Sequence, residues 1–315
     1  MTRAFVFPGQ GSQAVGMGRA LAEAFAPARE VFEEIDDALA QRLSRLMFEG
    51  PESDLTLTEN TQPALMAVSL AVMRVLEREG GFKAADKLAF VAGHSLGEYS
   101  ALAAAGALDL ADAARLLKRR GQAMQKAVPV GEGAMAALLG VDLPAAQEIA
   151  AAAAKDTGEI CATANDNAPG QVVVSGSKKA IDRVVVIAPE KGAKRAILLT
   201  VSAPFHCPLM QPAADEMEEA LAEAKIAAPV VPLIANVTAK HVVDPETIRA
   251  LLVKQITGMV RWRESVIYMK AQGVDKITEI GAGKVLAGLV KRIDREIEAS
   301  SAGEPVEVEA LLKVL

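Results

Sequence analysis

Residues 88–105 read LAFVAGHSLGEYSALAAA, and this stretch decides the fold. The apolar run 88–92 predicts a short buried strand, and the run 96–105 predicts a helix. Between them, residues 93–97 read GHSLG and match G-x-S-x-G, the pattern of a nucleophile elbow. In that elbow a tight turn exposes a strained serine, and the flanking glycines let neighbouring chain approach closely. Ser95 is therefore the candidate nucleophile; the simpler alternative is a glycine-rich turn whose serine caps the helix.

Short apolar runs alternate with longer helical patterns on both sides of the elbow. Strands are predicted at 4–7, 88–92, 230–235 and 276–280. Helices are predicted at 28–48, 61–79, 96–105, 110–128, 210–224, 246–256, 264–272 and 285–293. This alternation is typical of an α/β protein with a largely parallel sheet.

The rhythm changes between residues 131 and 201. Strands are predicted there at 134–139, 160–164, 171–175 and 195–200, and helices at 144–154 and 178–187. The order is strand, helix, strand, strand, helix, strand, which is the ferredoxin-like plan. Turn-forming residues at 165–170 predict a hairpin loop between the two middle strands. We therefore expect a ferredoxin-like subdomain over 131–201, inserted into a discontinuous large domain over 1–130 and 202–315.

Composition excludes several classes of protein. The chain has 315 residues, of which 51% are hydrophobic and 23% charged, so it has the apolar content to fold around a sizeable core. A net charge of -6 and an aromatic content of 3% argue against a nucleic-acid surface, which needs a basic field and stacking rings. Two cysteines form no disulfide framework, and no Cys/His spacing suggests zinc.

The same composition gives an expectation for compartment. The first apolar run, 4–7, is ended by Pro8 and Gly9 and is too short for the centre of a signal peptide. The longest Ala/Leu-rich stretches are broken by charge or glycine well before they reach the length of a membrane span. We expect a cytoplasmic protein that does not enter a membrane, with a monomer as the default state.

A serine nucleophile needs a base, and the chain has three histidines. His94 is the immediate neighbour of Ser95 on the turn, so we expect it to pack or to form a hydrogen bond. His241 lies in a polar stretch that is typical of a solvated loop. His206 remains, between the predicted insert and the next helix, and is the candidate base. No acid between Ser95 and His206 stands out as its partner, and a backbone carbonyl can orient the imidazole equally well.

The oxyanion of an acyl transfer needs two N–H donors. In elbow enzymes one donor is the amide after the nucleophile, here Leu96. The best source of the second is the glycine-containing loop after the first strand, where Gln10 supplies an amide. The same loop matches the loose dinucleotide pattern G-x-G-x-x-A over 9–14, but the acid that pattern requires at the end of a second strand falls within a predicted helix. Dinucleotide binding is therefore disfavoured.

One arginine indicates the polarity of the substrate. At 100° per residue, Arg120 falls at the edge of the apolar stripe of helix 110–128, whereas Arg119 falls opposite that stripe. A guanidinium turned inward binds a carboxylate or phosphate. Its partner is either an internal Asp or Glu or a substrate carboxylate, and the second case implies an acyl group with a free acid end.

Six ordered motifs together resemble the bacterial malonyl-coenzyme A:acyl carrier protein transacylase family. The likeness extends from the first strand to GAGKVL at 281–286, which is essentially the whole chain. Several ordered motifs are far more specific than any one of them. They are FPGQGSQ at 7–13, TQPA at 61–64, GHSLGE at 93–98, RG at 120–121, NAPGQ at 167–171 and FH at 205–206.

The resemblance implies an α/β-hydrolase-like large domain with a ferredoxin-like insert, and a serine acyltransferase that loads malonyl groups for fatty-acid synthesis. Its substrates are malonyl-coenzyme A and acyl carrier protein, and no metal or redox cofactor is implied. By the same resemblance, Ser95 is the nucleophile, His206 the base, and Arg120 the clamp of the malonyl carboxylate. Gln10 and Leu96 are the oxyanion amides, and the main-chain carbonyl of Arg261, in the segment Val260-Arg261-Trp262, orients the histidine.

Two rival functions remain open at this stage. A thioesterase or esterase uses the same elbow, and the difference is whether water reaches the acyl-serine. A carrier-binding scaffold with an inert site is disfavoured by the intact Ser95, His206 and Arg120. Two basic clusters are candidate docking patches for an acidic carrier. They are Lys178-Lys179 with 191–195, and Arg115 with Lys118 and Arg119.

Overall fold

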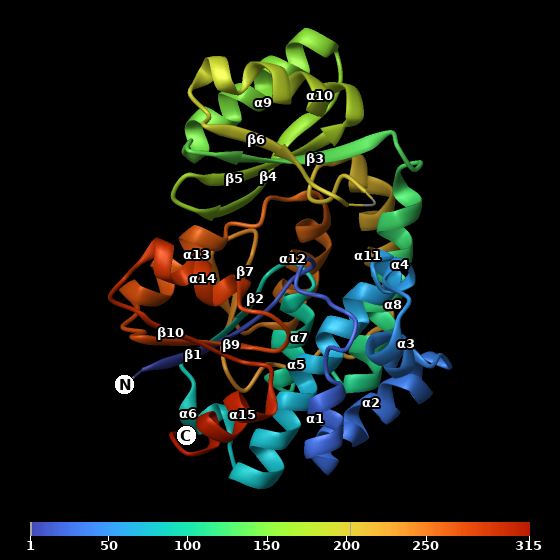
Figure 1. Cartoon of the computed structure of the whole chain (residues 1–315), viewed down its shortest axis with the longest axis vertical. Helices are drawn as coiled ribbons and strands as arrows, with labels where there is room; N and C mark the ends of the chain where they lie inside the picture. The colour runs from blue at the N-terminus through green and yellow to red at the C-terminus, as the bar shows by residue number, and fades with distance from the viewer. Residues whose placement is uncertain (1, 202) are drawn as a thin grey trace.

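The computed structural model describes residues 2–201 and 203–315, which form a large lobe and a smaller one stacked on it (Figure 1). In this part of the chain the large lobe is built on a six-stranded sheet with the order β10-β9-β1-β2-β7-β8. Its strands are β1 (Arg3–Phe7), β2 (Phe90–Gly93), β7 (Leu233–Ala235), β8 (Lys240–Val242), β9 (Lys276–Ile280) and β10 (Glu298–Ala302). All neighbours are parallel except β7 and β8, as the alternating pattern predicts for most of the sheet.

Strand β1 lies in the middle of this sheet, between β2 and β9. Residues 4–7 are fully buried because helices cover both faces, which explains their continuous apolar run. The helices of the large lobe are α1 (Arg19–Ala24), α2 (Ala26–Leu39), α3 (Leu43–Glu49), α4 (Glu52–Leu55), α5 (Thr58–Gly80), α6 (Ala84–Lys87), α7 (Gly97–Ala104), α8 (Leu110–Ala127), α11 (Gln211–Glu223), α12 (Pro245–Thr257), α13 (Trp262–Ala271), α14 (Val285–Ile293) and α15 (Pro305–Leu312). A 3-10 turn, η2 (Pro208–Met210), leads into α11.

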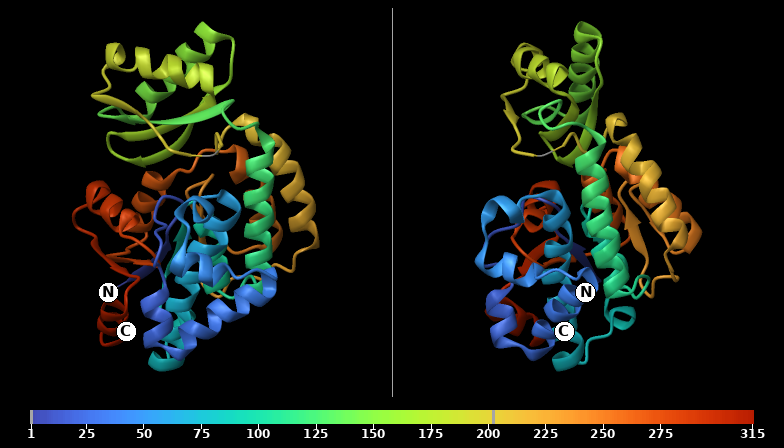
Figure 2. Two further views of the ribbon diagram at one scale, coloured as in Figure 1. Left: turned by 45° about the vertical axis from the view of Figure 1, so that its right-hand side comes forward. Right: turned by 90° about the vertical axis from the view of Figure 1, so that its right-hand side faces the viewer.

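The smaller lobe comes from one continuous stretch of chain. Its elements are β3 (Gly133–Leu139), α9 (Leu143–Thr157), β4 (Cys161–Ala168), β5 (Gln171–Ser177), α10 (Lys178–Ile187), the 3-10 turn η1 (Pro189–Lys191) and β6 (Arg195–Leu198). Within the described residues its sheet has the order β4-β5-β3-β6 and every pair is antiparallel. Both α9 and α10 lie on the face turned away from the large lobe, as the two views of Figure 2 also show. Residue 202, where the second segment of the predicted large domain begins, lies outside the described residues.

Two sequence predictions about elements were wrong. The helix predicted over 28–48 is two helices, because Ala40 adopts a left-handed conformation with φ 47° and ends α2. The hairpin loop predicted over 165–170 is mostly strand, since β4 runs to Ala168 and only the turn at 169–170 remains. Asn165, Asp166 and Asn167 are at most 9% exposed, so their side chains lie in the interior and not in a solvated loop.

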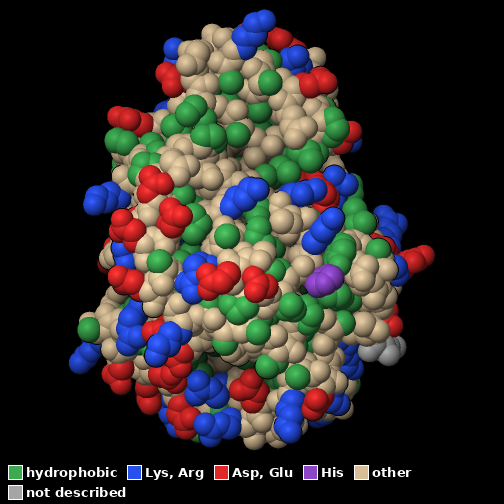
Figure 3. Space-filling view, turned by 180° about the vertical axis from the view of Figure 1, so that it is seen from behind, with side chains coloured by type: hydrophobic (Ala, Val, Ile, Leu, Met, Phe, Trp, Pro, Cys, Tyr) green, Lys and Arg blue, Asp and Glu red, His purple; other side chains and the backbone are tan. Residues whose placement is uncertain are grey.

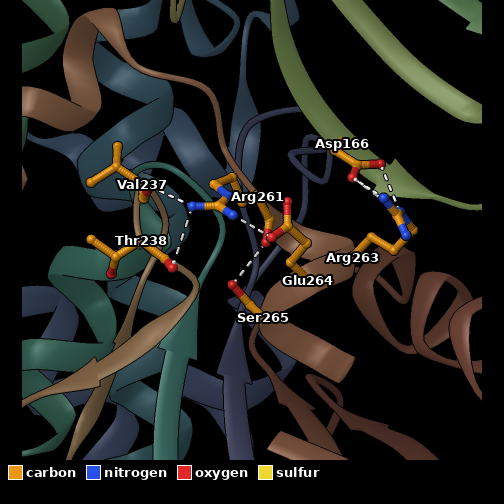
Figure 4. Close-up of polar contacts among 7 residues, drawn as sticks. All are labelled: Asp166, Val237, Thr238, Arg261, Arg263, Glu264 and Ser265. Carbon is orange, nitrogen blue, oxygen red and sulfur yellow. Dashed lines mark hydrogen bonds and ion pairs between the residues drawn. The ribbon is translucent and has the colours of Figure 1, made fainter. Parts of the chain in front are cut away.

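Strand β4 fastens the small lobe to the large one. The amide of Asp166 donates to the carbonyl of Val260 at 2.9 Å, and the amide of Val260 donates to the carbonyl of Ala164 at 2.8 Å. Arg263 on α13 forms an ion pair with the buried carboxylate of Asp166 at 2.8 Å (Figure 4). This seam fixes residues 165–167 beside the elbow of the large lobe.

Among the described helices, none is both long enough and apolar enough to cross a bilayer.

Candidate active site

The elbow after β2 has the strained geometry that its sequence predicts. Ser95 has φ 53°, in the left-handed region that side chains other than glycine rarely adopt. A Cβ atom on Gly93 would lie 1.9 Å from the carbonyl carbon of Gly97, and one on Gly97 would lie 2.3 Å from the carbonyl oxygen of Phe7. Both glycines are therefore required by close backbone contacts, and Ser95 stands at the start of α7.

His206 lies against the serine from the other side of the site. The Ser95 hydroxyl donates to His206 Nε2 at 2.8 Å, and His206 Nδ1 donates to the main-chain carbonyl of Gln255 at 2.8 Å. Because a carbonyl can only accept, Nδ1 carries the proton and Nε2 is free to receive the serine proton. Burial, reinforced by the positive charge of Arg120, lowers the pKa of His206 to about 3, so the imidazole is neutral.

The prediction that Arg261 supplies the orienting carbonyl was wrong. The Arg261 carbonyl accepts from the amide of Ser265 and from its hydroxyl, in the first turn of α13. The Arg261 side chain pairs with Glu264 and points toward the carbonyls of Val237 and Thr238 (Figure 4). The residue that orients His206 belongs instead to the end of α12, one helix earlier in the chain.

Arg120 is directed into the same site from α8. Its Nη2 donates to Ser95 Oγ at 3.1 Å and to Gln255 Oε1 at 2.7 Å, and its Nη1 donates to Gln62 Oε1 at 2.7 Å. The side chain is 1% exposed, and it forms no ion pair with a described Asp or Glu. Arg119, one residue earlier, is partly exposed and pairs with Glu216 at 3.3 Å. The helix geometry thus separated the two arginines correctly.

The nearest buried acid is kept from Arg120 by an amide. Glu98, 1% exposed, accepts from the amide of Asn236 at 3.0 Å and from Gln255 Nε2. The carbonyl end of the same Gln255 carboxamide faces Arg120. Burial raises the pKa of Glu98 to about 7, against the lowering effect of these hydrogen bonds. The internal ion pair that the sequence left open for Arg120 is therefore absent from the described residues.

The two predicted oxyanion donors border the same cavity. Leu96 follows the nucleophile, and Gln10 lies in the loop after β1 with its side chain held by Thr58 Oγ1 at 3.0 Å. Within the described chain, neither the amide of Leu96 nor that of Gln10 donates a hydrogen bond. A Cβ on Gly9 would lie 2.8 Å from the His94 carbonyl, so glycine lets this loop reach the elbow.

These groups converge on a cavity of about 310 Å³ between the two lobes. Its walls carry the predicted nucleophile, base, guanidinium and oxyanion residues together with apolar side chains from both lobes. They are Gln10, Gly11, Gln13, Gln62, His94, Ser95, Leu96, Arg120, Met124, Met135, Asn165, Leu199, Thr200, Val201, Phe205 and His206. One polar end beside an apolar wall suits a short acyl chain that ends in an anion.

The expectation of a packing or hydrogen-bonding role is confirmed for His94, but the expectation of a solvated loop was wrong for His241. His94 is half-buried and its Nε2 contacts Asn167 Oδ1 at 2.9 Å, so its ring bonds away from Ser95. His241 is exposed, although it lies on the edge strand β8 and not in a loop. Sequence reasoning missed Asn236 and the side chain of Gln255, because neither stands in a local motif and each meets the elbow only through the fold.

Comparison with known proteins identifies the family. Residues 4–310 match the model of the acyl transferase domain. The chain is 47% identical over 311 residues to the malonyl CoA-acyl carrier protein transacylase of Escherichia coli K12, covering 99% of both chains. The chain belongs to the malonyl CoA-acyl carrier protein transacylase family. It is an acyltransferase, similar also to the Bacillus subtilis transacylase at 45% identity, over 99% of this chain and 96% of the relative.

Solved structures of other transacylases have the same fold. An acyl-carrier-protein S-malonyltransferase from Bartonella henselae is 56% identical and superposes with a TM-score of 0.97 over 100% of this chain and 99% of its own. A malonyl-transacylase solved in complex with its type II PKS acyl-carrier protein is 42% identical, with a TM-score of 0.96 and full coverage of both chains.

Proposed function

We propose that this chain transfers a malonyl group from malonyl-coenzyme A to the phosphopantetheine thiol of acyl carrier protein, through a malonyl-Ser95 intermediate, in fatty-acid biosynthesis. The observation that carries the proposal is the environment of Arg120. Its buried guanidinium touches the nucleophile and has amides and a hydroxyl for partners, with no acid among the described residues. A buried cation without a counter-ion is costly, and a substrate carboxylate supplies the missing charge.

The first half-reaction acylates the serine. His206 Nε2 takes the Ser95 hydroxyl proton as Oγ attacks the thioester carbonyl, and the Leu96 and Gln10 amides hold the oxyanion. When the tetrahedral intermediate collapses, the C–S bond breaks and the departing coenzyme A sulfur takes the proton from His206 and leaves as the thiol. Arg120 binds the free carboxylate of the malonyl group throughout.

The second half-reaction returns the enzyme to its starting state. The carrier thiol gives its proton to His206 and attacks the malonyl-Ser95 carbonyl. The C–O bond to Ser95 then breaks, and the serine oxygen recovers its proton from His206. Every proton in both steps passes through His206 Nε2, and coenzyme A leaves before the carrier thiol attacks, which makes the sequence ping-pong.

The rival function is hydrolysis at the same serine. The apolar wall of Met124, Met135, Leu199, Val201 and Phe205 disfavours it, because it limits water around the acyl-serine. The deciding experiment follows coenzyme A release from malonyl-coenzyme A with and without a carrier that bears phosphopantetheine. We expect a single burst without carrier and continuous turnover with it. Continuous release of free malonate without carrier would assign the chain to the hydrolases.

The domain description also belongs to the proposal. We take residues 1–130 and 202–315 as one discontinuous, α/β-hydrolase-like catalytic domain, and 131–201 as an inserted ferredoxin-like subdomain. The strand order β4-β5-β3-β6, with two helices on one face, supports the second assignment. A cytoplasmic, monomeric enzyme remains our expectation for its state in the cell.

The docking surface for the acidic carrier is proposed on the small lobe. In the small-lobe cluster Lys178 pairs with Asp182 at 2.7 Å, so the proposal rests on Lys191, Lys194 and Arg195, which are exposed and form no ion pair with a described residue. In the alternative cluster, by contrast, Arg115, Lys118 and Arg119 each pair with an acid. On the face drawn in Figure 3, basic and acidic side chains are mixed, so charge alone selects no patch there.

A further inference from the structure

The elbow is held from outside by a carboxamide. Asn236 follows directly after β7 and is 1% exposed. Its Oδ1 accepts from the amide of Ser95 at 2.8 Å, and its Nδ2 donates to the carbonyl of Gly93 at 2.6 Å. One side chain from the neighbouring strand therefore binds the residue at the end of β2 and the nucleophile itself.

The backbone of Asn236 is fixed as firmly as its side chain. Its amide donates to Glu98 Oε1 at 3.0 Å, and its carbonyl accepts from the amide of Arg261 at 3.0 Å. Glu98 lies one turn after Ser95 on α7, and its second oxygen accepts from Gln255 Nε2. Glu98 thus links the backbone of Asn236 to the side chain of Gln255.

Gln255 completes the enclosure of Ser95. Its Nε2 donates to the Ser95 carbonyl at 2.9 Å, so Asn236 holds the amide of Ser95 and Gln255 holds its carbonyl. A residue held at φ 53° costs on the order of 1–3 kcal/mol, and it keeps that conformation only where its surroundings over-determine it. These two carboxamides provide that restraint.

We infer that Asn236 is a positioning residue for the nucleophile: it holds Ser95 in the left-handed conformation that aims Oγ between His206 and Arg120. Asn236 lies outside the cavity lining and touches neither the acyl group nor the reacting atoms. The inference rests on Ser95 being the nucleophile of the proposed function. Its test therefore includes a reagent that needs neither malonyl-coenzyme A nor carrier.

The experiment measures Ser95 labelling by a fluorophosphonate and, separately, the single-turnover acylation by malonyl-coenzyme A, both per folded molecule. Asn236→Leu keeps the side-chain size but leaves the Ser95 amide and the Gly93 carbonyl without partners. We expect both rates to fall on the order of 100-fold, because small misplacement of a reacting group costs about that much, while the KM for malonyl-coenzyme A stays near the wild-type value. Ser95→Ala controls for labelling elsewhere.

Asn60→Leu is the matched control, because it also replaces a buried carboxamide and leaves buried polar groups without hydrogen-bond partners. Asn60 is also a buried carboxamide, donating to the Asp54 carbonyl at 2.9 Å, but it lies at the start of α5 away from the cavity. We expect Asn60→Leu to lower thermal stability and to leave both rates near wild type. A wild-type labelling rate in folded Asn236→Leu would overturn the inference. So would slow acylation by malonyl-coenzyme A combined with normal fluorophosphonate labelling, because that result would assign Asn236 to substrate binding.

Asn236→Asp carries the test if Asn236→Leu does not fold. A protonated carboxyl both accepts from the Ser95 amide and donates to the Gly93 carbonyl, as the carboxamide does. The ionised form loses the donor and faces Glu98, while Arg120 and His206 lie beyond Gln255 and Ser95. The labelling rate of Asn236→Asp, divided by that of the wild type, should therefore rise as the pH falls from about 8 to about 5. Burial raises the pKa of a carboxyl, so the new carboxyl is expected to gain its proton within this range. A ratio independent of pH contradicts the inference.

A failure of the proposed function gives a different result. If wild-type Ser95 reacts with the fluorophosphonate but not with malonyl-coenzyme A, the acyl donor is wrong. The effect of Asn236→Leu on fluorophosphonate labelling then still decides the positioning role.

Discussion

Arg119 and Arg120 are adjacent in the chain but differ in burial and in their hydrogen-bond and ion-pair partners. Arg119 is partly exposed and paired with Glu216, whereas Arg120 is buried beside Ser95. We predict that Arg120→Ala slows malonyl transfer on the order of 100-fold more than acetyl transfer, because only malonate has a carboxylate to lose its partner. Arg119→Ala, measured with a small thiol acceptor, should leave this ratio unchanged. Equal losses of both acyl groups in Arg120→Ala would make that arginine a structural residue.

His206 is predicted to stay neutral far below the usual histidine range. Its pKa of about 3 means that the base form persists as the pH falls, whereas a histidine with a pKa of about 6.5 is mostly protonated near pH 5. Nitrogen NMR of labelled protein, with His206→Ala for assignment, should show the Nδ1-protonated tautomer of His206 from about pH 8 to about pH 5. A titration of that signal near pH 6.5 would contradict the burial argument.

Those candidate site residues that the structure brings together, and that sequence reasoning named, each carry a signal in the sequence. Ser95 stands in a five-residue motif, Arg120 follows from helix geometry, and His206 remains after elimination among three histidines. Asn236 and Gln255 lack such a signal, because each follows or ends an ordinary element and meets the elbow only when the sheet is assembled. The orienting carbonyl was assigned to Arg261 for the same reason: a main-chain group can belong to any residue.

At the scale of elements, periodicity predicted where most helices and strands lie but not where single residues interrupt them. Ala40 ends α2 in a left-handed conformation, which an alanine in the sequence does not predict. The polar residues of β4 predict a loop, although they form a strand, because turn formers and buried interface residues have the same composition. The edge strands β8 and β10 and the last helix α15 went unpredicted, since edge strands need no continuous apolar run.

The ion pair between α13 and β4 gives a prediction about stability. Asp166 is 1% exposed, so removing its partner leaves a buried charge unpaired, which costs about 3–5 kcal/mol. Arg263→Ala should therefore lower the free energy of unfolding by about that amount in chemical denaturation. Arg261→Ala is the matched control, two residues earlier on the same helix start. Its pair with Glu264 is about one-third exposed and should be worth under about 1 kcal/mol. Similar losses in the two variants would contradict the importance of the seam.

At the scale of the whole molecule, the cavity lies between two lobes that contribute different parts of its wall. The large lobe supplies the candidate nucleophile, the candidate base and the guanidinium, and the small lobe supplies Met135, Asn165 and the segment Leu199–Val201 as part of the wall. The small-lobe part of the wall is held over this site because β4 is fastened to Val260 and Arg263. The alternation of elements predicted a largely parallel sheet and a second, antiparallel sheet, while the seam between them had no signature in the sequence.

The proposed docking surface predicts which half-reaction depends on surface charge. Reversing Lys191, Lys194 and Arg195 to Glu should raise the KM for carrier protein several-fold, with a weaker salt dependence, because exposed charges steer an acidic partner. Acylation of Ser95 by malonyl-coenzyme A should remain near wild type. The same reversal at Arg115, Lys118 and Arg119 is the comparison, and a larger effect there would move the docking surface to α8.

Under the proposed function, Ser95 carries the malonyl group between donor and acceptor. The most direct measurement is intact-protein mass spectrometry after mixing with malonyl-coenzyme A in the absence of carrier, followed by peptide mapping. We predict one added malonyl, mapped to Ser95, which disappears when carrier bearing phosphopantetheine is added and never forms in Ser95→Ala. A malonyl group that still attaches to Ser95→Ala, or one that carrier does not remove, would contradict it.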